Sequence, residues 1–158
     1  MTIQQATAND MPEIMALVSS VFSGEQAIPP ELIPIPAEKS PRWWCIRQEG
    51  RIAATVALYR DGEEWHMGRL AVAPGLRGGH IATRLLDTAI PAVFAMGIDT
   101  IHTECRDATV HILKRFGGEI TGQPQTFFNG SITPVTLRRE NLPREFLPLG
   151  KTEDPAGK

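Results

Sequence analysis

The sequence LAVAPGLRGGHIATRLL, residues Leu70 to Leu86, decides the fold. An apolar run ends at Pro74, a glycine-rich turn with one arginine follows, and apolar residues then return at helical spacing. This order predicts a strand, a loop and a helix. The first backbone N–H groups of a helix have no partner within it and carry partial positive charge, so they can bind an anion. A plain turn that begins a helix is the alternative interpretation.

The glycine-rich turn matches neither of two common phosphate-binding patterns. The three glycines of G-x-G-x-x-G are absent, and so is G-K-[ST]. His80 stands where a glycine would be expected, and a positive φ there would be unfavourable for a residue with a side chain. We expect the helix to have begun already at His80, which then has ordinary α geometry and an imidazole that points away from the backbone amides.

The sequence before this stretch predicts one helix and an antiparallel meander. Asp10 and Pro12 mark the start of a helix over residues 11–22, in which apolar residues recur at helical spacing. Five prolines between residues 27 and 41 exclude a long helix or a central strand, so we expect an ordered loop with at most one short helical turn. Residue types and turn signals predict strands at residues 2–6, 42–48, 52–60 and 65–72.

The sequence after the opening stretch alternates between helices and strands. The helix of that stretch should extend to about Met96, although Pro91 is expected to kink it or end it early. Further elements are a strand at 100–105, a helix at 107–116 closed by Gly117, and a hairpin with its turn at Asn129-Gly130 and a final strand at 132–138. We expect residues 1–139 to form one domain and residues 140–158 to form a mobile tail.

Composition indicates an ordinary soluble protein. The 158 residues are 42% hydrophobic and 22% charged, and the net charge of −2 argues against a general binder of nucleic acids or membranes. The N-terminus lacks the basic and apolar segments of a signal peptide, and no apolar run is long enough to span a membrane, so we expect a cytoplasmic protein. Cys45 and Cys105 have no metal-ligand spacing, so we expect buried, reduced thiols and no bound metal.

Three segments resemble one enzyme family. Val72-Ala73-Pro74, followed by Arg77-Gly78-Gly79-His80-Ile81-Ala82, resembles the acetyl-CoA motif [QR]-x-x-G-x-[GA] of the GCN5-related N-acetyltransferases, with His80 at the central glycine. Residues 108–117 resemble the helix that follows in that family. Residues 21–29 resemble the V-F-x-x-E-Q-x-[IV]-P stretch of its YjcF and ElaA-like bacterial branch. The order of the predicted strands and helices also fits the family.

The resemblance implies a mixed α/β fold, with a mostly antiparallel central sheet of six to seven strands flanked by helices. Two neighbouring strands, residues 65–72 and 100–105, would splay apart and admit the pantetheine of acetyl-CoA. A homodimer is frequent in such folds. The implied acetyl-CoA-binding residues are Leu70, Ala71 and Val72 for the pantetheine, and Arg77, Gly78, Gly79, His80, Ile81 and Ala82 for the pyrophosphate.

Acetyl transfer needs a neutral amine, and a lysine-like amine has a pKa of about 10.4, so a base must remove a proton. The candidate bases lie on the two splayed strands, with Glu104 first and His102 and His66 after it. Each of them could instead be an exposed polar residue or a side chain with a partner in the sheet. Family members often use a tyrosine of the second helix as the acid, but the corresponding residue here is Leu113, and the chain's one tyrosine, Tyr59, lies on an earlier strand.

We therefore expect an N-acetyltransferase that moves the acetyl group of acetyl-CoA directly to a primary amine in a ternary complex. An acyl-enzyme on Cys105 would need an activated thiol. The alternative, favoured by Leu113, is a catalytically weak or inactive protein of the same fold that binds or senses acetyl-CoA. The acceptor stays open among small metabolites, antibiotics, polyamines and protein N-termini. We expect Arg69 to pair with an acidic neighbour rather than with a substrate carboxylate.

Overall fold

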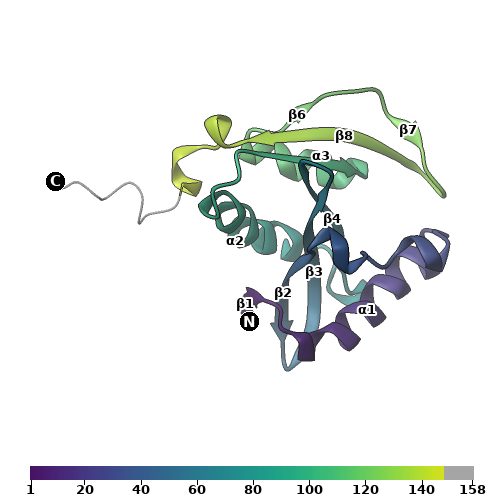
Figure 1. Ribbon diagram of the computed structural model, residues 1–158. Coiled ribbons are helices and arrows are strands. Elements are labelled where there is room, and N and C mark those ends of the chain that lie inside the picture. The colour runs from purple at the N-terminus through teal and green to yellow at the C-terminus, as the bar shows by residue number, and fades with distance from the viewer. Residues whose placement is uncertain (148–158) are drawn as a thin grey trace.

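The computed structural model describes residues 1–147, and eight strands within them form one sheet (Figure 1). The strands are β1 (Thr2–Gln5), β2 (Arg42–Gln48), β3 (Arg51–Asp61), β4 (Glu64–Val72), β5 (Thr100–Cys105), β6 (Glu119–Ile120), β7 (Gln125–Thr126) and β8 (Ser131–Arg138). Their spatial order is β1-β2-β3-β4-β5-β8-β6, and β7 pairs with β8 beside this path. All pairs are antiparallel except β4 with β5. The expected mixed α/β fold is confirmed.

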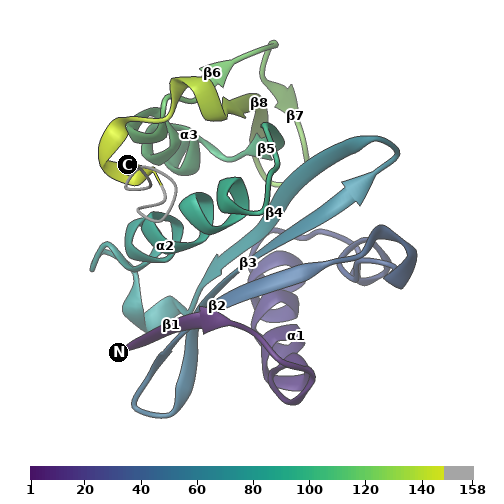
Figure 2. The same cartoon turned by 60° about the vertical axis from the view of Figure 1, so that its left-hand side comes forward.

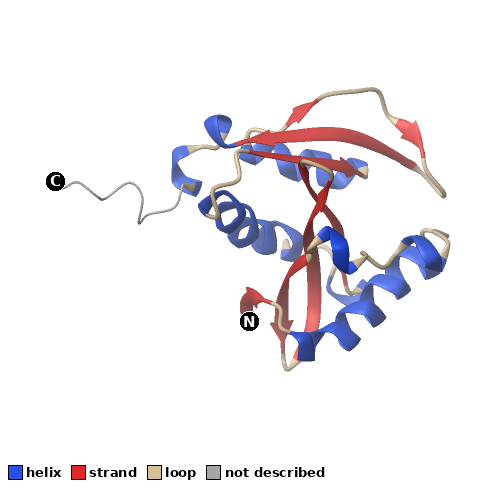
Figure 3. Cartoon of the chain, viewed as in Figure 1, coloured by secondary structure: helices blue, strands red, loops and turns tan. Residues whose placement is uncertain are grey.

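Helices cover both faces of the sheet (Figures 2 and 3). Helix α1 (Met11–Ser19) lies on one face, and α2 (Ile81–Ala95) and α3 (Asp107–Leu113) lie on the other. Each face has its own buried apolar cluster. The α1 cluster contains Ile14, Val18, Val21, Ile28, Ile33, Trp43, Cys45, Ile52, Ala57 and Ala71. The α2 cluster includes Trp44, Leu58, Met67, Leu85, Phe94, Ile101, Cys105, Leu113, Phe116 and Leu137.

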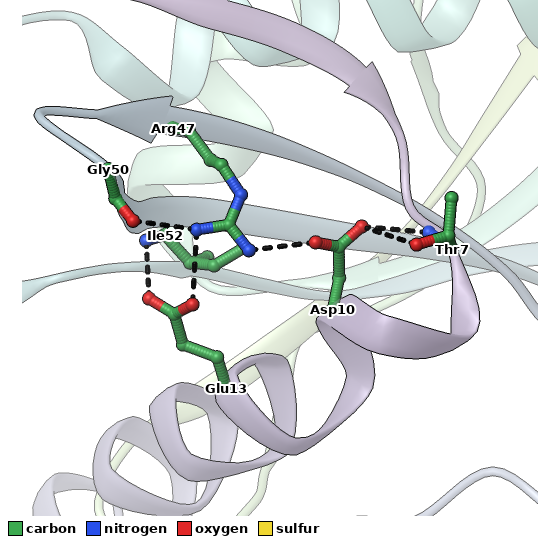
Figure 4. A network of polar contacts seen from close by, with 6 residues as sticks. All are labelled: Thr7, Asp10, Glu13, Arg47, Gly50 and Ile52. Atoms are coloured by element: carbon green, nitrogen blue, oxygen red, sulfur yellow. Dashed lines mark hydrogen bonds and ion pairs between the residues drawn. The ribbon is translucent and has the colours of Figure 1, made fainter.

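Polar contacts fix the start of α1 on the hairpin of β2 and β3 (Figure 4). Arg47 Nη2 donates to Asp10 Oδ1 at 2.7 Å, and Arg47 Nη1 donates to Glu13 Oε1 at 3.1 Å. Glu13 Oε2 also accepts the backbone N–H of Ile52 at 2.7 Å. The hydrogen bond from Arg47, helped by the backbone N–H of Thr7, holds the pKa of Asp10 below its ordinary value. The carboxylate is therefore charged at neutral pH and binds the helix to the sheet.

The chain between α1 and β2 differs in detail from the expectation. The α-helix ends at Ser19 and continues as a π-helical segment, Ser20–Glu25, so the helical run is longer and less regular than the predicted helix over residues 11–22. The proline-rich segment that follows holds two 3₁₀ turns, Pro30–Leu32 and Ala37–Lys39, where at most one was expected. Pro30 suits the first helical position of its turn because its φ is fixed, whereas Pro36 lies just before its turn as the N-cap residue.

Helix α2 passes through Pro91 and ends at Ala95, close to the expected end at about Met96. Of the two effects expected of Pro91, a kink or an early end, the early end is wrong. A proline removes one N–H from the helical hydrogen bonds, but tertiary packing can outweigh that loss. Val93 and Phe94, in the last turn, are fully buried in the α2 cluster. Their burial holds the turn that follows the proline.

Residues at the end of the described chain pack against the domain. Leu142 is buried in the α2 cluster, and the ring of Phe146 lies 4.6 Å from that of Phe116, centroid to centroid. Gly117, at φ +79°, ends the helical turn after α3, as expected. The rest of the expected mobile tail, residues 148–158, lies outside the described residues. Across residues 1–147, no helix has both the length and the apolar character that crossing a bilayer requires.

Candidate active site

A cleft opens where β4 and β5 separate. The two strands pair only at Trp65 with Ile101, His66 with His102, and Met67 with Thr103. Beyond this point β4 continues without β5, whose last residues pair only with β8 on the other side. The cleft has a volume of about 430 Å³. The strands thus splay apart as expected.

A β-bulge in β4 accompanies the separation. The register between β3 and β4 shifts between Thr55 and Ala57, and Arg69 on the bulged strand has φ +57°. The guanidinium of Arg69 donates to the carbonyl oxygens of Ile33 at 2.7 Å and Leu32 at 3.1 Å. The expected acidic partner is wrong: Arg69 ties the proline-rich segment to the bulge through backbone carbonyls. Bulges increase local twist and redirect a strand, which suits the point where two strands diverge.

The backbone of Val72 faces the cleft. Ala73 N donates to Ala53 O at 2.8 Å, so the preceding pair, Val72 with Ala54, makes no hydrogen bonds between its strands. The carbonyl oxygen of Val72 accepts hydrogen bonds from Arg77, from Nε at 3.1 Å and from Nη2 at 3.0 Å. The N–H of Val72 is therefore the group of this residue that stays available to a ligand in the cleft.

The glycine-rich turn joins β4 to α2 with a geometry that differs from the expectation at His80. His80 has φ +61° and ψ +25°, a left-handed conformation, and α2 begins one residue later at Ile81. Its carbonyl accepts the first helical hydrogen bond, from Arg84 N at 3.0 Å. The expectation of α geometry at His80 is wrong, because the chain must turn from an extended Arg77 into the helix and a left-handed residue completes that turn. The amides of Ile81 and Ala82 begin the helix, where N–H groups have no helical partners.

The three candidate bases lie on the face of the sheet that carries α1. Met67 and Ile101 belong to the α2 cluster on the other face, and side chains alternate along a strand. His66, His102 and Glu104 are therefore directed toward the side of α1. Glu104 and His66 line the cleft, whereas His102 lies beside His66 with 5.5 Å between ring centroids.

Glu64 bridges the two histidines. Its Oε1 lies 3.2 Å from Nε2 of His66, and its Oε2 lies 3.8 Å from Nε2 of His102. Glu104 makes no side-chain hydrogen bond or ion pair with residues 1–147, so its carboxylate stays available to a ligand in the cleft. The site therefore combines an unpaired carboxylate in the cleft with a pair of histidines that share one carboxylate.

Tyr59 also lines the cleft, although its strand, β3, is not one of the two that splay apart. Its ring stacks on His66 at 5.8 Å, and its hydroxyl lies over Gly68. Tyr59 and His66 face each other across β3 and β4. The register of this hairpin is the signal that would have found it.

Two buried residues near the site, Leu113 and Cys105, limit the chemistry that it can perform. Leu113, which the resemblance aligns with the tyrosine of other family members, is 2% exposed and packs in the α2 cluster. Cys105 is buried, and burial raises the pKa of its thiol, while a contact with Thr103 Oγ1 at 3.3 Å opposes that rise. A neutral thiol is a poor nucleophile, so an acyl-enzyme on Cys105 has no support. Cys45 is likewise buried and unbridged, as expected.

Comparison with known proteins gives the class. A family model for the acetyltransferase (GNAT) family matches residues 11–117, and the chain belongs to this family. It is therefore an acyltransferase, with the cleft between β4 and β5 as its candidate active site. No curated protein sequence matches the chain.

Solved structures share its fold at low identity. Escherichia coli ElaA superposes with a TM-score of 0.76 and 15% identity, covering 87% of this chain and 99% of that one. An acyl-CoA N-acyltransferase from Pseudomonas aeruginosa gives 0.71 and 14%, covering 86% and 97%. A ribosomal-protein-alanine N-acetyltransferase from Brucella melitensis gives 0.71 and 17%, covering 87% and 99%.

Proposed function

We propose that the chain transfers the acetyl group of acetyl-CoA to a primary amine, directly and within a ternary complex. The observation that carries this proposal is the cleft itself. Helix amides and the Val72 N–H lie along the β4–α2 side, and Glu104 and His66 face the side of α1. Two substrates can therefore meet at the splay point from opposite sides of the sheet.

Acetyl-CoA would bind along β4. The N–H of Val72 would donate to the pantetheine, with Leu70 and Ala71 beside it. The amides of the turn from Arg77 through Gly78, Gly79 and His80 to Ile81 and Ala82 would hold the pyrophosphate. Hydrogen bonds to a charged acceptor contribute about 1.5–3 kcal/mol each, so a few give useful affinity. Arg77 would have to exchange its ion pair with Glu25, at 2.7 Å, for a phosphate.

Glu104 is the base in this proposal. Its carboxylate lies free in the cleft and can take a proton from the ammonium form of the acceptor, which makes the amine nucleophilic. The histidine pair, His66 and His102, is the second choice because Glu64 already engages both rings. Tyr59 is the chain's one tyrosine, and its ring stacks on that of His66.

The test is release of free CoA from acetyl-CoA with a panel of primary amines. We expect Glu104→Gln to lower kcat/KM by about 100-fold or more, the usual range for loss of a general base. Glu119→Gln, which breaks a surface ion pair with Arg138, is the matched control and should leave turnover unchanged. Unchanged turnover of Glu104→Gln across pH would remove Glu104 from this role, and loss of activity in His66→Asn or His102→Asn would assign it to the histidines.

The second candidate is a protein that binds or senses acetyl-CoA without turnover. Leu113 favours it, because a buried leucine cannot protonate the departing thiolate. Calorimetry would then detect acetyl-CoA binding while no amine of the panel releases CoA.

A further inference from the structure

Arg106 stands directly after β5 and lines the cleft beside the candidate base. It follows the alternation of His102 and Glu104, so its side chain is directed toward the side of α1. Its Nε donates to Gln26 Oε1 at 3.2 Å. Its Nη1 donates to the carbonyl oxygens of Phe127 at 2.8 Å and Phe128 at 3.4 Å. Neutral acceptors thus hold the guanidinium in place and leave its charge uncompensated.

The remaining nitrogen of Arg106 has no partner. Nη2 is buried and makes no hydrogen bond, a state that only one other side-chain atom of residues 1–147 shares, Gln48 Oε1. No carboxylate within residues 1–147 lies within 4.0 Å of the Arg106 guanidinium. By contrast, Arg77, which also lines the cleft, forms an ion pair with Glu25 at 2.7 Å. Because an unpaired buried donor is unfavourable, Arg106 calls for an anionic partner from outside the chain.

A carboxylate fits the free edge of this guanidinium. A planar guanidinium binds a carboxylate through two parallel N–H donors. Nη2 has no partner and can supply one of them. Nη1 can supply the other by giving up its hydrogen bond to Phe128 O, which at 3.4 Å is the longest that Arg106 makes. The cleft that Arg106 lines also has apolar side chains, among them Phe22, Ile28, Ile33 and Phe127. The Phe127 ring packs over the guanidinium at 5.5 Å. Because Nη2 is buried, a ligand reaches it only when a neighbouring side chain such as this ring moves. Phe127 follows β7, a strand of two residues, which holds the ring only locally.

We propose that the acceptor is an amine that carries a carboxylate and an apolar group, as an amino acid with an apolar side chain does, and that Arg106 binds the carboxylate. This inference rests on the proposed acetyl transfer. Arg106 and Glu104 are two residues apart on one face, so one ligand can place its carboxylate on the guanidinium and its amine beside the base. Cofactor phosphate is the less suitable partner, because the helix amides that suit phosphate lie at the start of α2 and Arg106 contacts Gln26 on the side of α1.

Matched pairs of amines test the proposal. Each pair joins an amino acid to the amine that lacks its carboxylate: phenylalanine with phenethylamine, and leucine with isopentylamine. CoA release is measured for the unmodified chain and for Arg106→Gln, and the ratio of kcat/KM between the two members of each pair is calculated for each protein. Comparing this ratio between the two proteins cancels the different basicities of the two amines. We expect Arg106→Gln to lower kcat/KM for the amino acid by about 10- to 100-fold relative to its partner, with an unchanged KM for acetyl-CoA.

Two control variants sharpen the result. Arg106→Lys keeps the charge but loses the planar pair of donors. Its ratio of kcat/KM within a pair should therefore lie between the ratios of the unmodified chain and of Arg106→Gln. Arg138→Gln removes a surface arginine of β8 and should behave as the unmodified chain.

Three outcomes would overturn the proposal. Equal losses for both members of each pair, with a lowered thermal midpoint, would give Arg106 a structural role only. A raised KM for acetyl-CoA would assign the guanidinium to cofactor phosphate. If no amine releases CoA although acetyl-CoA binds, the proposed acetyl transfer fails independently of the carboxylate site. Calorimetry then compares the binding of N-acetylphenylalanine, which carries a carboxylate, with that of N-phenethylacetamide, which does not. Equal binding of N-acetylphenylalanine to the unmodified chain and to Arg106→Gln would refute the carboxylate site.

Discussion

His80→Gly tests the geometry of the turn that begins α2. A residue with a side chain in the left-handed conformation is less stable by about 1–2 kcal/mol, and His80 has φ +61°. Glycine removes that strain, but its greater freedom in the unfolded chain costs about 0.4–1 kcal/mol. The difference of the central values is a net stabilisation of about 0.8 kcal/mol, which corresponds to a rise of roughly 2 °C in the thermal midpoint.

The assay is urea unfolding followed by tryptophan fluorescence, with two further variants. His80→Ala keeps the left-handed strain and should gain nothing. Arg84→Gly places glycine inside α2, on an exposed position in α geometry, and should destabilise by about 0.8 kcal/mol. Opposite signs for the two glycine variants support the left-handed geometry at His80. If His80→Gly destabilises as much as Arg84→Gly, the helix already includes residue 80 and the structural description of this turn is refuted.

Two further substitutions test contacts elsewhere in the fold. Asp10→Asn should destabilise the protein at neutral pH. Because Arg47 lowers the pKa of Asp10, the stabilisation from this carboxylate is fully present above the unfolded pKa of about 3.9 and is lost as the pH falls through the lowered value. The thermal midpoints of the two proteins should therefore converge in acid, and a constant difference would contradict the prediction. Gly117→Ala should lower the free energy of unfolding in urea by about 2–4 kcal/mol, because the new Cβ would overlap the carbonyl of Asn141 in addition to the strain at φ +79°. Gly97→Ala, at φ +91° with open space around the new Cβ, should lower it by only about 1 kcal/mol. Equal losses of stability in the two variants would exclude the overlap.

Local patterns predicted the elements because each depends on neighbouring residues. Apolar spacing placed α1 and α2, and the Gly117 stop, which closes the helical run after α3, agrees with its positive φ. The failures occurred where distant contacts decide. Pro91 did not end α2, because the buried Phe94 holds the last turn, and Arg69 found carbonyls of the proline-rich segment rather than a carboxylate.

The candidate site was harder to predict because its parts meet through strand register. Glu104 and His66 could be proposed from their strands alone, since both follow the simple alternation of side chains. Tyr59 could not, because its place beside His66 depends on how β3 aligns with β4. Arg106 could not either, since its incomplete hydrogen bonding is visible only after Gln26 and Phe127 reach it from other parts of the chain.

The bulge at Arg69 explains why alternation fails within β4. Trp65 and Met67 pack against the α2 cluster, and strict alternation would place Leu70 and Val72 on the opposite face from them. In the structure Leu70 and Val72 also pack against the α2 cluster, and Ala71 joins the α1 cluster, so the two faces exchange at the bulge. The same exchange occurs just beyond the last pair of β4 with β5, Met67 with Thr103. One irregular residue thus accompanies both the opening of the cleft and the change of face, and no periodic pattern in the sequence encodes it, because a bulge adds a residue to one strand only.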